Sequence, residues 1–233
     1  MSKYIFLLLF ILTSVLISSD SPVEAFKNKE YKKAFELYMQ RAKDGNTTAQ
    51  NAVSYLYFNG LGVVKNTEKG MEWLQKAAKS SDALAQYDLG MMYLSGYNVN
   101  QDILKAFNWL KKAAAQNNVN AEYNLALMYY NGDATDQNVT KAAELLEQAA
   151  NNGHKGALQN VGRVYMQILK FDKAAYWLEK NAQQGDENAY YLLAEIYCSE
   201  EKFPQAKKWA QKAIDAGNIE AKELWDKYNL KEY

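Results

Sequence analysis

The sequence predicts an all-α fold in which helical hairpins repeat along the chain as a solenoid. Three sets of residues carry this prediction. A tryptophan or leucine returns at intervals of 36, 36, 36, 32 and 32 residues, and residues that end helices return at the same intervals. A third set pairs an alanine with a tyrosine eight residues later. Such self-similarity, at a period of roughly 20 to 50 residues, indicates units that bury their apolar faces against one another.

The first helix of each unit opens on alanine and closes on tyrosine. Ala85, Leu89 and Tyr93 share one helix face because their spacing is i, i+4 and i+8. The small residue lets backbones approach, and the tyrosine ring fills the space beyond it. The pattern predicts first helices over residues 49–57, 85–93, 121–129, 157–165 and 189–197.

The second helix of each unit is centred on the recurring tryptophan or leucine. In one copy Trp109, Leu110 and Ala113 fall on one side of a helix, which leaves Lys111 and Lys112 facing water. We therefore expect the tryptophans of these helices in the core. The central residues of the six copies are Leu37, Trp73, Trp109, Leu145, Trp177 and Trp209.

Signals for the ends and starts of helices accompany these segments. Glycine and asparagine adopt the left-handed conformation of a helix end at least cost, and serine does so less readily. The predicted stops of the second helices are Gly45, Ser81, Asn117, Gly153, Gly185 and Gly217. Pro204 suits a first helical turn. The side chains expected to cap other second helices are those of Asn66, Asn100, Asp136 and Asp172.

The connection between the two helices of a unit changes along the chain. Gly60, Gly96 and Gly132 recur at an interval of 36 residues, but Ile168 stands at the next such position. The glycine is therefore lost where the period falls to 32 residues. Longer loops are predicted at 59–65, 95–100 and 131–136, and tighter turns at 169–172 and 199–203.

Composition excludes several classes of function. Lysine plus arginine and aspartate plus glutamate number 27 each, so the chain lacks the excess positive charge that nucleic-acid binding needs. Cys198 is the only cysteine, which excludes an internal disulfide and a paired-cysteine metal site. His154 is the only histidine, and we expect it in the loop at a helix C-terminus. No catalytic residue, metal or cofactor is predicted, because no nucleophile elbow, HExxH or phosphate-loop motif is present.

The N-terminal residues differ from the array. Lys3 precedes an apolar run over residues 5–17, which is shorter than the roughly 20 residues that span a bilayer and fits a signal peptide. We predict a signal peptide over 1–25, with its cleavage site open, and export to the periplasm or the cell exterior. Retention as a membrane anchor through residues 4–17 is the alternative. Residues 26–233 then form a single array of about six helix pairs, whose first helix, at 22–28, is short and imperfect and which ends in a capping helix near Ala221.

Two segments of the array resemble a known repeat. Residues 85–96 read AQYDLGMMYLSG and residues 105–114 read KAFNWLKKAA, and together they closely resemble the Sel-one-like repeat, a 36-residue relative of the tetratricopeptide repeat. The resemblance runs from about Ala25 to the C-terminus and is strongest over 49–153. It implies a right-handed superhelix of antiparallel helix pairs whose concave face, built by the first helices, binds proteins or peptides.

The face that the resemblance places in the concavity is rich in tyrosine and amide side chains. Tyrosine offers a large, rigid contact area with a polar tip, and amides can bond a partner's backbone, so this composition suits peptide recognition. For Tyr87 and Tyr123, packing between adjacent units is the open alternative. The candidate partner-binding residues are Asn51, Tyr55, Tyr87, Met91, Tyr123, Tyr130, Asn131, Gln159, Arg163 and Tyr191.

These features predict a non-catalytic scaffold that binds a protein or peptide outside the cytoplasm. Two alternatives stay open. Secreted cysteine-rich relatives of the family are linked to β-lactam or cell-wall compounds, which would imply a hydrolase, although Cys198 alone cannot form their disulfide pattern. The other alternative is a bacterial secreted factor that acts on a host cell.

Overall fold

A computed structural model describes residues 21–233, which form thirteen α-helices and a C-terminal 3-10 turn with no strand among them. The predicted all-α class is confirmed. Most of the segment predicted as a signal peptide lies outside the described residues. Contacts divide the chain into two compact units, of which unit 1 ends at Gln116 and unit 2 begins at Asn117.

Unit 1 contains the short N-terminal helix and the first complete helix pairs. The short helix is the one that the sequence predicts near Pro22, and proline occupies its first turn. The helices of this unit are α2 (Pro22–Lys27), α3 (Tyr31–Lys43), α4 (Thr47–Asn59), α5 (Thr67–Lys79), α6 (Ala83–Ser95) and α7 (Ile103–Ala114).

Unit 2 continues the alternation of first and second helices and ends in the predicted capping helix. Its helices are α8 (Val119–Asn131), α9 (Val139–Asn151), α10 (Lys155–Gln167), α11 (Phe171–Gln183), α12 (Asn188–Ser199), α13 (Phe203–Asp215) and α14 (Glu220–Lys227), and the chain closes on η1 (Leu230–Glu232). The tight turns predicted before α11 and α13 are confirmed.

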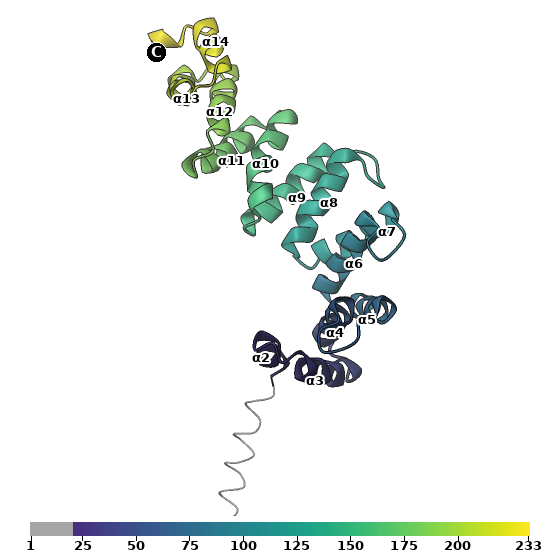
Figure 1. Cartoon of the computed structure of the whole chain (residues 1–233). Helices are drawn as coiled ribbons and strands as arrows, with labels where there is room; N and C mark the ends of the chain where they lie inside the picture. Colours follow the sequence, from purple (N-terminus) through teal and green to yellow (C-terminus); the bar gives the residue numbers. More distant parts are fainter. Residues whose placement is uncertain (1–20) are drawn as a thin grey trace, which may run out of the picture. The chain divides into compact units, whose positions relative to one another are not determined.

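Helices pack in consecutive pairs within each unit. In unit 1, α4 lies against α5 and α6 lies against α7 (Figure 1). In unit 2, α8 packs on α9, α10 on α11 and α12 on α13. Successive pairs also touch, as α5 with α6 and α9 with α10. Fully buried alanines such as Ala85 and Ala106 let these helices approach closely.

The predicted helix stops are confirmed at all six positions. The backbone of each has a positive φ, between 60° at Asn117 and 92° at Gly45. Ser81, which has no special aptitude for this conformation, adopts it at φ 67°. Gly60, Gly96 and Gly132 likewise end the first helices in the left-handed region. The recurrence of stop residues therefore reflects a recurring backbone requirement.

The predicted helix starts are partly wrong. Asn66 caps α5 as expected, since its side chain accepts the Lys69 N–H at 2.9 Å. The caps of α7 and α9 are Asp102 and Asn138 rather than Asn100 and Asp136. The loop after each glycine runs two residues further than expected, because Asp102 N–H and Asn138 N–H first bond back to the carbonyls of the tyrosines that precede the loops.

The start of α11 differs from the prediction in another way. Lys170 stands at its N-cap without a side-chain cap, and Asp172 lies inside the first turn. A carboxylate there is stabilised by the positive end of the helix dipole, but it does not cap the backbone. The tight turn before α11 places Lys170 at the cap position, and its side chain has no oxygen that could accept a backbone N–H.

The recurring tryptophans occupy the core to different degrees. Trp177 and Trp209 are buried, whereas Trp73 and Trp109 are half-buried and pack against the margin of apolar clusters. A lysine three residues on covers each ring, and the Lys112 ammonium lies 4.3 Å from the Trp109 ring centre. Lys112, one of the two lysines that we expected to face water, therefore also shields an indole ring by cation–π contact.

No helix between residues 21 and 233 is long and apolar enough to cross a membrane.

Candidate functional site

Four of the predicted partner-binding residues lie on the first helices of unit 1. Asn51 and Tyr55 belong to α4, and Tyr87 and Met91 belong to α6. The structure brings Asn51, Tyr55 and Met91 together around one pocket. Tyr87 is half-buried and lines neither this pocket nor the one beside it.

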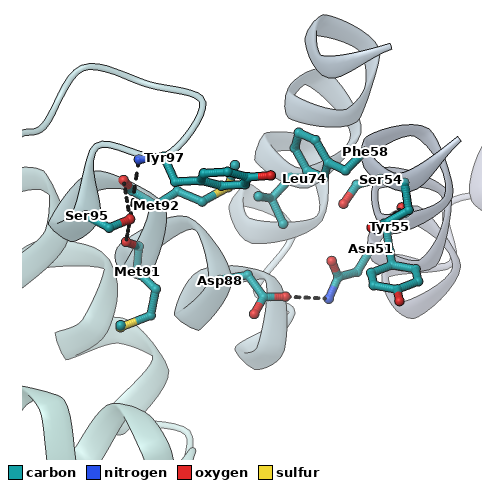
Figure 2. Close-up of a pocket in the computed structure, with 11 residues that line it drawn as sticks. Asn51, Ser54, Tyr55, Phe58, Leu74, Asp88, Met91, Met92, Ser95 and Tyr97 are labelled. Carbon is teal, nitrogen blue, oxygen red and sulfur yellow. Dashed lines mark hydrogen bonds between the residues drawn. The ribbon is translucent and has the colours of Figure 1, made fainter. Parts of the chain in front are cut away.

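The first pocket opens between α4 and α6 and has a volume of about 430 Å³. Figure 2 shows Phe58 and Leu74 on one side and Met91, Met92 and Tyr97 on the other. These side chains make the walls largely apolar. Ser54, Asn59 and Ser95 add polar groups to its lining.

A second pocket of about 480 Å³ lies next to the first and shares part of its lining. Phe26 of α2 and Leu84 at the start of α6 provide its apolar walls. The Phe26 ring meets the Tyr55 ring edge to face, with centres 6.1 Å apart. The short N-terminal helix therefore completes this pocket.

Asn51, Tyr55 and Asp88 line both pockets and form the boundary between them. The Asn51 amide Nδ2 donates to Asp88 Oδ2 at 3.5 Å (Figure 2). Burial raises the pKa of the Asp88 carboxyl, the Asn51 bond opposes the shift and the nearby Asp82 carboxylate adds to it. Asn51, which we expected to be a contact residue, is itself buried, so its polar group is satisfied within the protein.

Exposed apolar side chains gather around the two pockets. Tyr55 is 52% exposed, Leu84 54% and Tyr97 63%, and each lines one or both pockets. Large apolar side chains that cluster on a surface beside hollows are typical of sites that bind another molecule. The α4–α6 surface defined by these pockets is called the Tyr55 face below.

The other predicted residues lie in unit 2. Asn131, Gln159 and Arg163 are exposed, and Tyr123, Tyr130 and Tyr191 are half-buried. The Asn131 amide donates to Asp133 at 3.1 Å. Burial, with smaller contributions from Glu195 and the α14 carboxylates, raises the pKa of Tyr191. None of the six belongs to the Tyr55 face.

His154 corrects one expectation from the sequence. It follows the stop residue of α9, but its side chain caps the start of α10, since Nδ1 accepts the Ala157 N–H at 3.0 Å. Its ring also stacks on Tyr123, with centres 4.2 Å apart. The equivalent caps at the starts of α4, α6 and α8 are asparagine or aspartate, so histidine here introduces a titratable cap.

We expect this cap to make unit 2 less stable in mild acid. Burial lowers the pKa of His154 below its ordinary value of 6.5, so the unfolded chain binds the proton more readily than the folded chain does. The stability that the neutral His154 cap contributes is fully present above pH 6.5 and is lost as the pH falls through the lowered pKa of the folded state. The loss is at most about 1 kcal/mol, the typical worth of a side-chain cap.

The variant His154→Asn tests this dependence, because asparagine caps α4 and α8 but does not titrate. Free energies of unfolding in urea, measured between about pH 8 and pH 5, should fall more steeply for the wild type than for the variant. Parallel curves for the two proteins would show that His154 protonation does not matter.

A polar cluster in unit 2 joins three helices and was not predicted. Glu147 of α9 accepts bonds from the Tyr165 hydroxyl at 2.6 Å, the Lys173 ammonium at 2.7 Å and the Trp177 indole at 3.3 Å. Burial opposes ionisation, but the three bonds lower the pKa of Glu147 overall. Burial and Glu147 together raise the pKa of Tyr165 to about 12. Because every member is engaged, we assign the cluster to structure.

The thiol of Cys198 is also unsuited to chemistry. The side chain is buried in α12, and burial raises its pKa above the ordinary value of 9.0. The thiol form therefore dominates at neutral pH, and thiolate is the reactive form. Within residues 21–233, His, Cys, Asp and Glu side chains do not gather in threes as a metal site would require.

Sequence reasoning missed several residues of the Tyr55 face, among them Asp88, Tyr97, Leu84 and Phe26. A signal for Asp88 was present. The corresponding positions of the other first helices hold Ala52, Asn124, Asn160 and Leu192, so Asp88 is the one charged residue in that row. Tyr97 lies in a loop and Leu84 precedes the periodic segment, so neither belongs to the helix face from which the prediction was made.

Comparison with known proteins adds evidence on the repeats. The sequence pattern of the Sel1 repeat matches residues 47–82, 83–118, 119–154, 168–186 and 188–218. A Sel1 repeat protein from Oxalobacter formigenes has a similar solved structure, with 31% identity, 87% of each chain covered and a TM-score of 0.68. Among curated proteins, no sequence matches significantly.

A second solved structure is similar over most of this chain. It is a protective antigen present in uropathogenic Escherichia coli strains that displays an SLR fold. The identity is 27%, the match covers 85% of this chain and 44% of that chain, and the TM-score is 0.65.

Proposed function

The chain belongs to the Sel1 repeat family, and we propose that it is a non-catalytic scaffold that binds a protein or peptide segment on the Tyr55 face. Sel1 and tetratricopeptide-like repeats generally mediate protein–protein interactions and generally lack catalytic activity. The family therefore supplies the class of function, and the geometry of unit 1 supplies the surface.

The observation that carries the proposal is the pair of adjoining pockets between α4 and α6. At about 430 and 480 Å³, each is large enough to take apolar side chains of a partner segment. Three predicted residues, Asn51, Tyr55 and Met91, line them. Tyrosine in such a place is a frequent anchor of binding energy.

Replacing Tyr55 by alanine is expected to weaken partner binding by at least about tenfold, because one well-placed aromatic anchor contributes more than about 1.4 kcal/mol. Met91→Ala should weaken binding by a smaller factor, about fivefold. The test begins with affinity capture of partners by the 233-residue chain. Dissociation constants of the identified partner are then measured by calorimetry for each variant.

Tyr176→Ala is the matched control for Tyr55→Ala. Tyr176 is 53% exposed, almost the same as Tyr55, but it lies on α11 in unit 2 and lines neither pocket. We expect its replacement to leave affinity unchanged. If Tyr55→Ala and Tyr176→Ala bind the partner as tightly as the wild type, the Tyr55 face is not the binding surface.

We also propose that the scaffold works outside the cytoplasm, either in the periplasm or beyond the cell, because an apolar run at 5–17 after Lys3 has the length of a signal segment. Cell fractionation, combined with N-terminal sequencing of the mature chain, tests this. A processed chain in the periplasm or medium supports the proposal. A membrane fraction with an intact N-terminus would favour the anchor at 4–17, and a cytoplasmic chain would exclude export.

A further inference from the structure

The charges on the Tyr55 face restrict what can bind there. Asp88 is the only charged residue that lines the first pocket, and the second is lined by Asp88 and Asp82. Neither lining includes a lysine, arginine or histidine. The walls around these carboxylates are largely apolar, so water screens their charge less than on an open polar surface.

The two carboxylates differ in the number and length of the hydrogen bonds that they accept from the protein. Asp82 caps α6 by accepting the Ala85 N–H at 2.8 Å, and its other oxygen accepts from the Thr48 hydroxyl at 3.4 Å. Among the described residues, Asp88 accepts only the long Asn51 bond at 3.5 Å, from a neutral amide. Within residues 21–233, the ion pairs of the structure do not include Asp88.

Asp88 is therefore a half-buried carboxylate without a countercharge in the part of the chain that the structure describes. Its pKa, raised by burial, reports the cost of keeping the charge there. A cationic group of a partner would offset this desolvation cost. A neutral segment would leave the cost unchanged, and an acidic segment would increase it.

The location of Asp88 between the two pockets further restricts the partner. Asp88, together with Asn51 and Tyr55, separates the two apolar pockets. Building on the proposed function, we propose that the partner segment carries a lysine or arginine with an apolar side chain on each side of it. The basic group meets Asp88 at the boundary, and the two apolar side chains fill the adjoining pockets.

Synthetic peptides test this pattern on the full 233-residue chain. In each peptide a central lysine, glutamine or glutamate is flanked on both sides by leucine or phenylalanine at varied spacing. We expect the best lysine peptide to bind about tenfold more tightly than its glutamine counterpart, with the glutamate peptide weaker still. Asp88→Asn should reduce the lysine preference to less than about threefold.

Glu72→Gln is the matched control for Asp88→Asn. It removes a carboxylate from the exposed side of α5, away from both pockets, and should preserve the tenfold preference. Because the comparison among peptides needs only the wild type, the test does not depend on the folding of any variant. The lysine preference should also shrink as salt is added.

The outcomes separate this inference from the proposed function. Peptide binding that is lost in Tyr55→Ala but shows no preference for lysine would overturn the basic-partner pattern and leave the Tyr55 face as the binding surface. Binding that survives Tyr55→Ala would overturn both. Failure of every lysine-centred peptide to bind would also overturn the pattern.

Discussion

Replacement of Trp177 by alanine is expected to lower the free energy of unfolding of unit 2 by about 3 to 5 kcal/mol, the usual cost of deleting a large buried aromatic side chain. Trp177 is 1% exposed and sits in α11, which packs on both α10 and α12. Its indole N–H also bonds Glu147 of α9 at 3.3 Å. The variant therefore leaves a cavity and removes one of the bonds that hold Glu147.

Urea denaturation followed by far-UV circular dichroism measures this loss, and hydrogen exchange shows where it occurs. Because each repeat is stabilised by its neighbours, exchange should accelerate in α9, α10 and α12 as well as in α11. Two controls grade the effect. Trp109→Ala should be milder because that ring is half-buried, and the exposed Lys111→Ala should stay within about 0.5 kcal/mol. Equal losses for Trp177 and Lys111 would contradict this view of the core.

The second large effect is expected at Gly62, in the loop between α4 and α5. Its φ is +70°, and a Cβ added there would collide with the backbone carbonyl group of Tyr31 and the amide nitrogen of Lys32. Backbone cannot swing aside as a flexible side chain can. We expect Gly62→Ala to destabilise unit 1 by about 3 to 4 kcal/mol, the sum of left-handed strain and overpacking.

Gly45→Ala separates these two contributions. Gly45 also has a positive φ, +92°, but an added Cβ there would meet nothing within 4 Å. Its replacement should therefore cost only the strain, about 1 kcal/mol. Thermal unfolding of both variants gives the comparison, and a Gly62→Ala loss no larger than that of Gly45→Ala would show that the loop shifts away from α3 without cost.

The repeat itself could be predicted from the sequence because the same residue types recur at the same positions in several units. The helix stop recurs in six units. The left-handed conformation of Ser81 could therefore be predicted from its position in the repeat, although serine itself does not favour it. The helix starts were less secure. Several loop residues, such as Asn100 and Asp102, carry suitable oxygens, and only the backbone bond from Asp102 N–H to Tyr93 decides which one caps the helix.

The candidate site was predictable to a smaller degree. Helical spacing found Tyr55 and Met91, since both lie on one face of their helices. It missed Tyr97 and Phe26, which reach the pockets from a loop and from a helix earlier in the chain. A periodic pattern describes what the repeats share, so it does not reveal residues such as these, which occur in one repeat alone.

The change from 36-residue to 32-residue repeats alters the loop between the two helices of a unit. The longer repeat carries a loop whose Tyr97 lines the first pocket, whereas the shorter turns before α11 and α13 lack this loop. Helix packing rests on the alanine and tryptophan rows, which both lengths retain. We therefore expect that exchanging the loop after α6, which carries Tyr97, would alter what the Tyr55 face binds. The loop after α4 also packs against the α3 backbone at Gly62, so its exchange would cost stability.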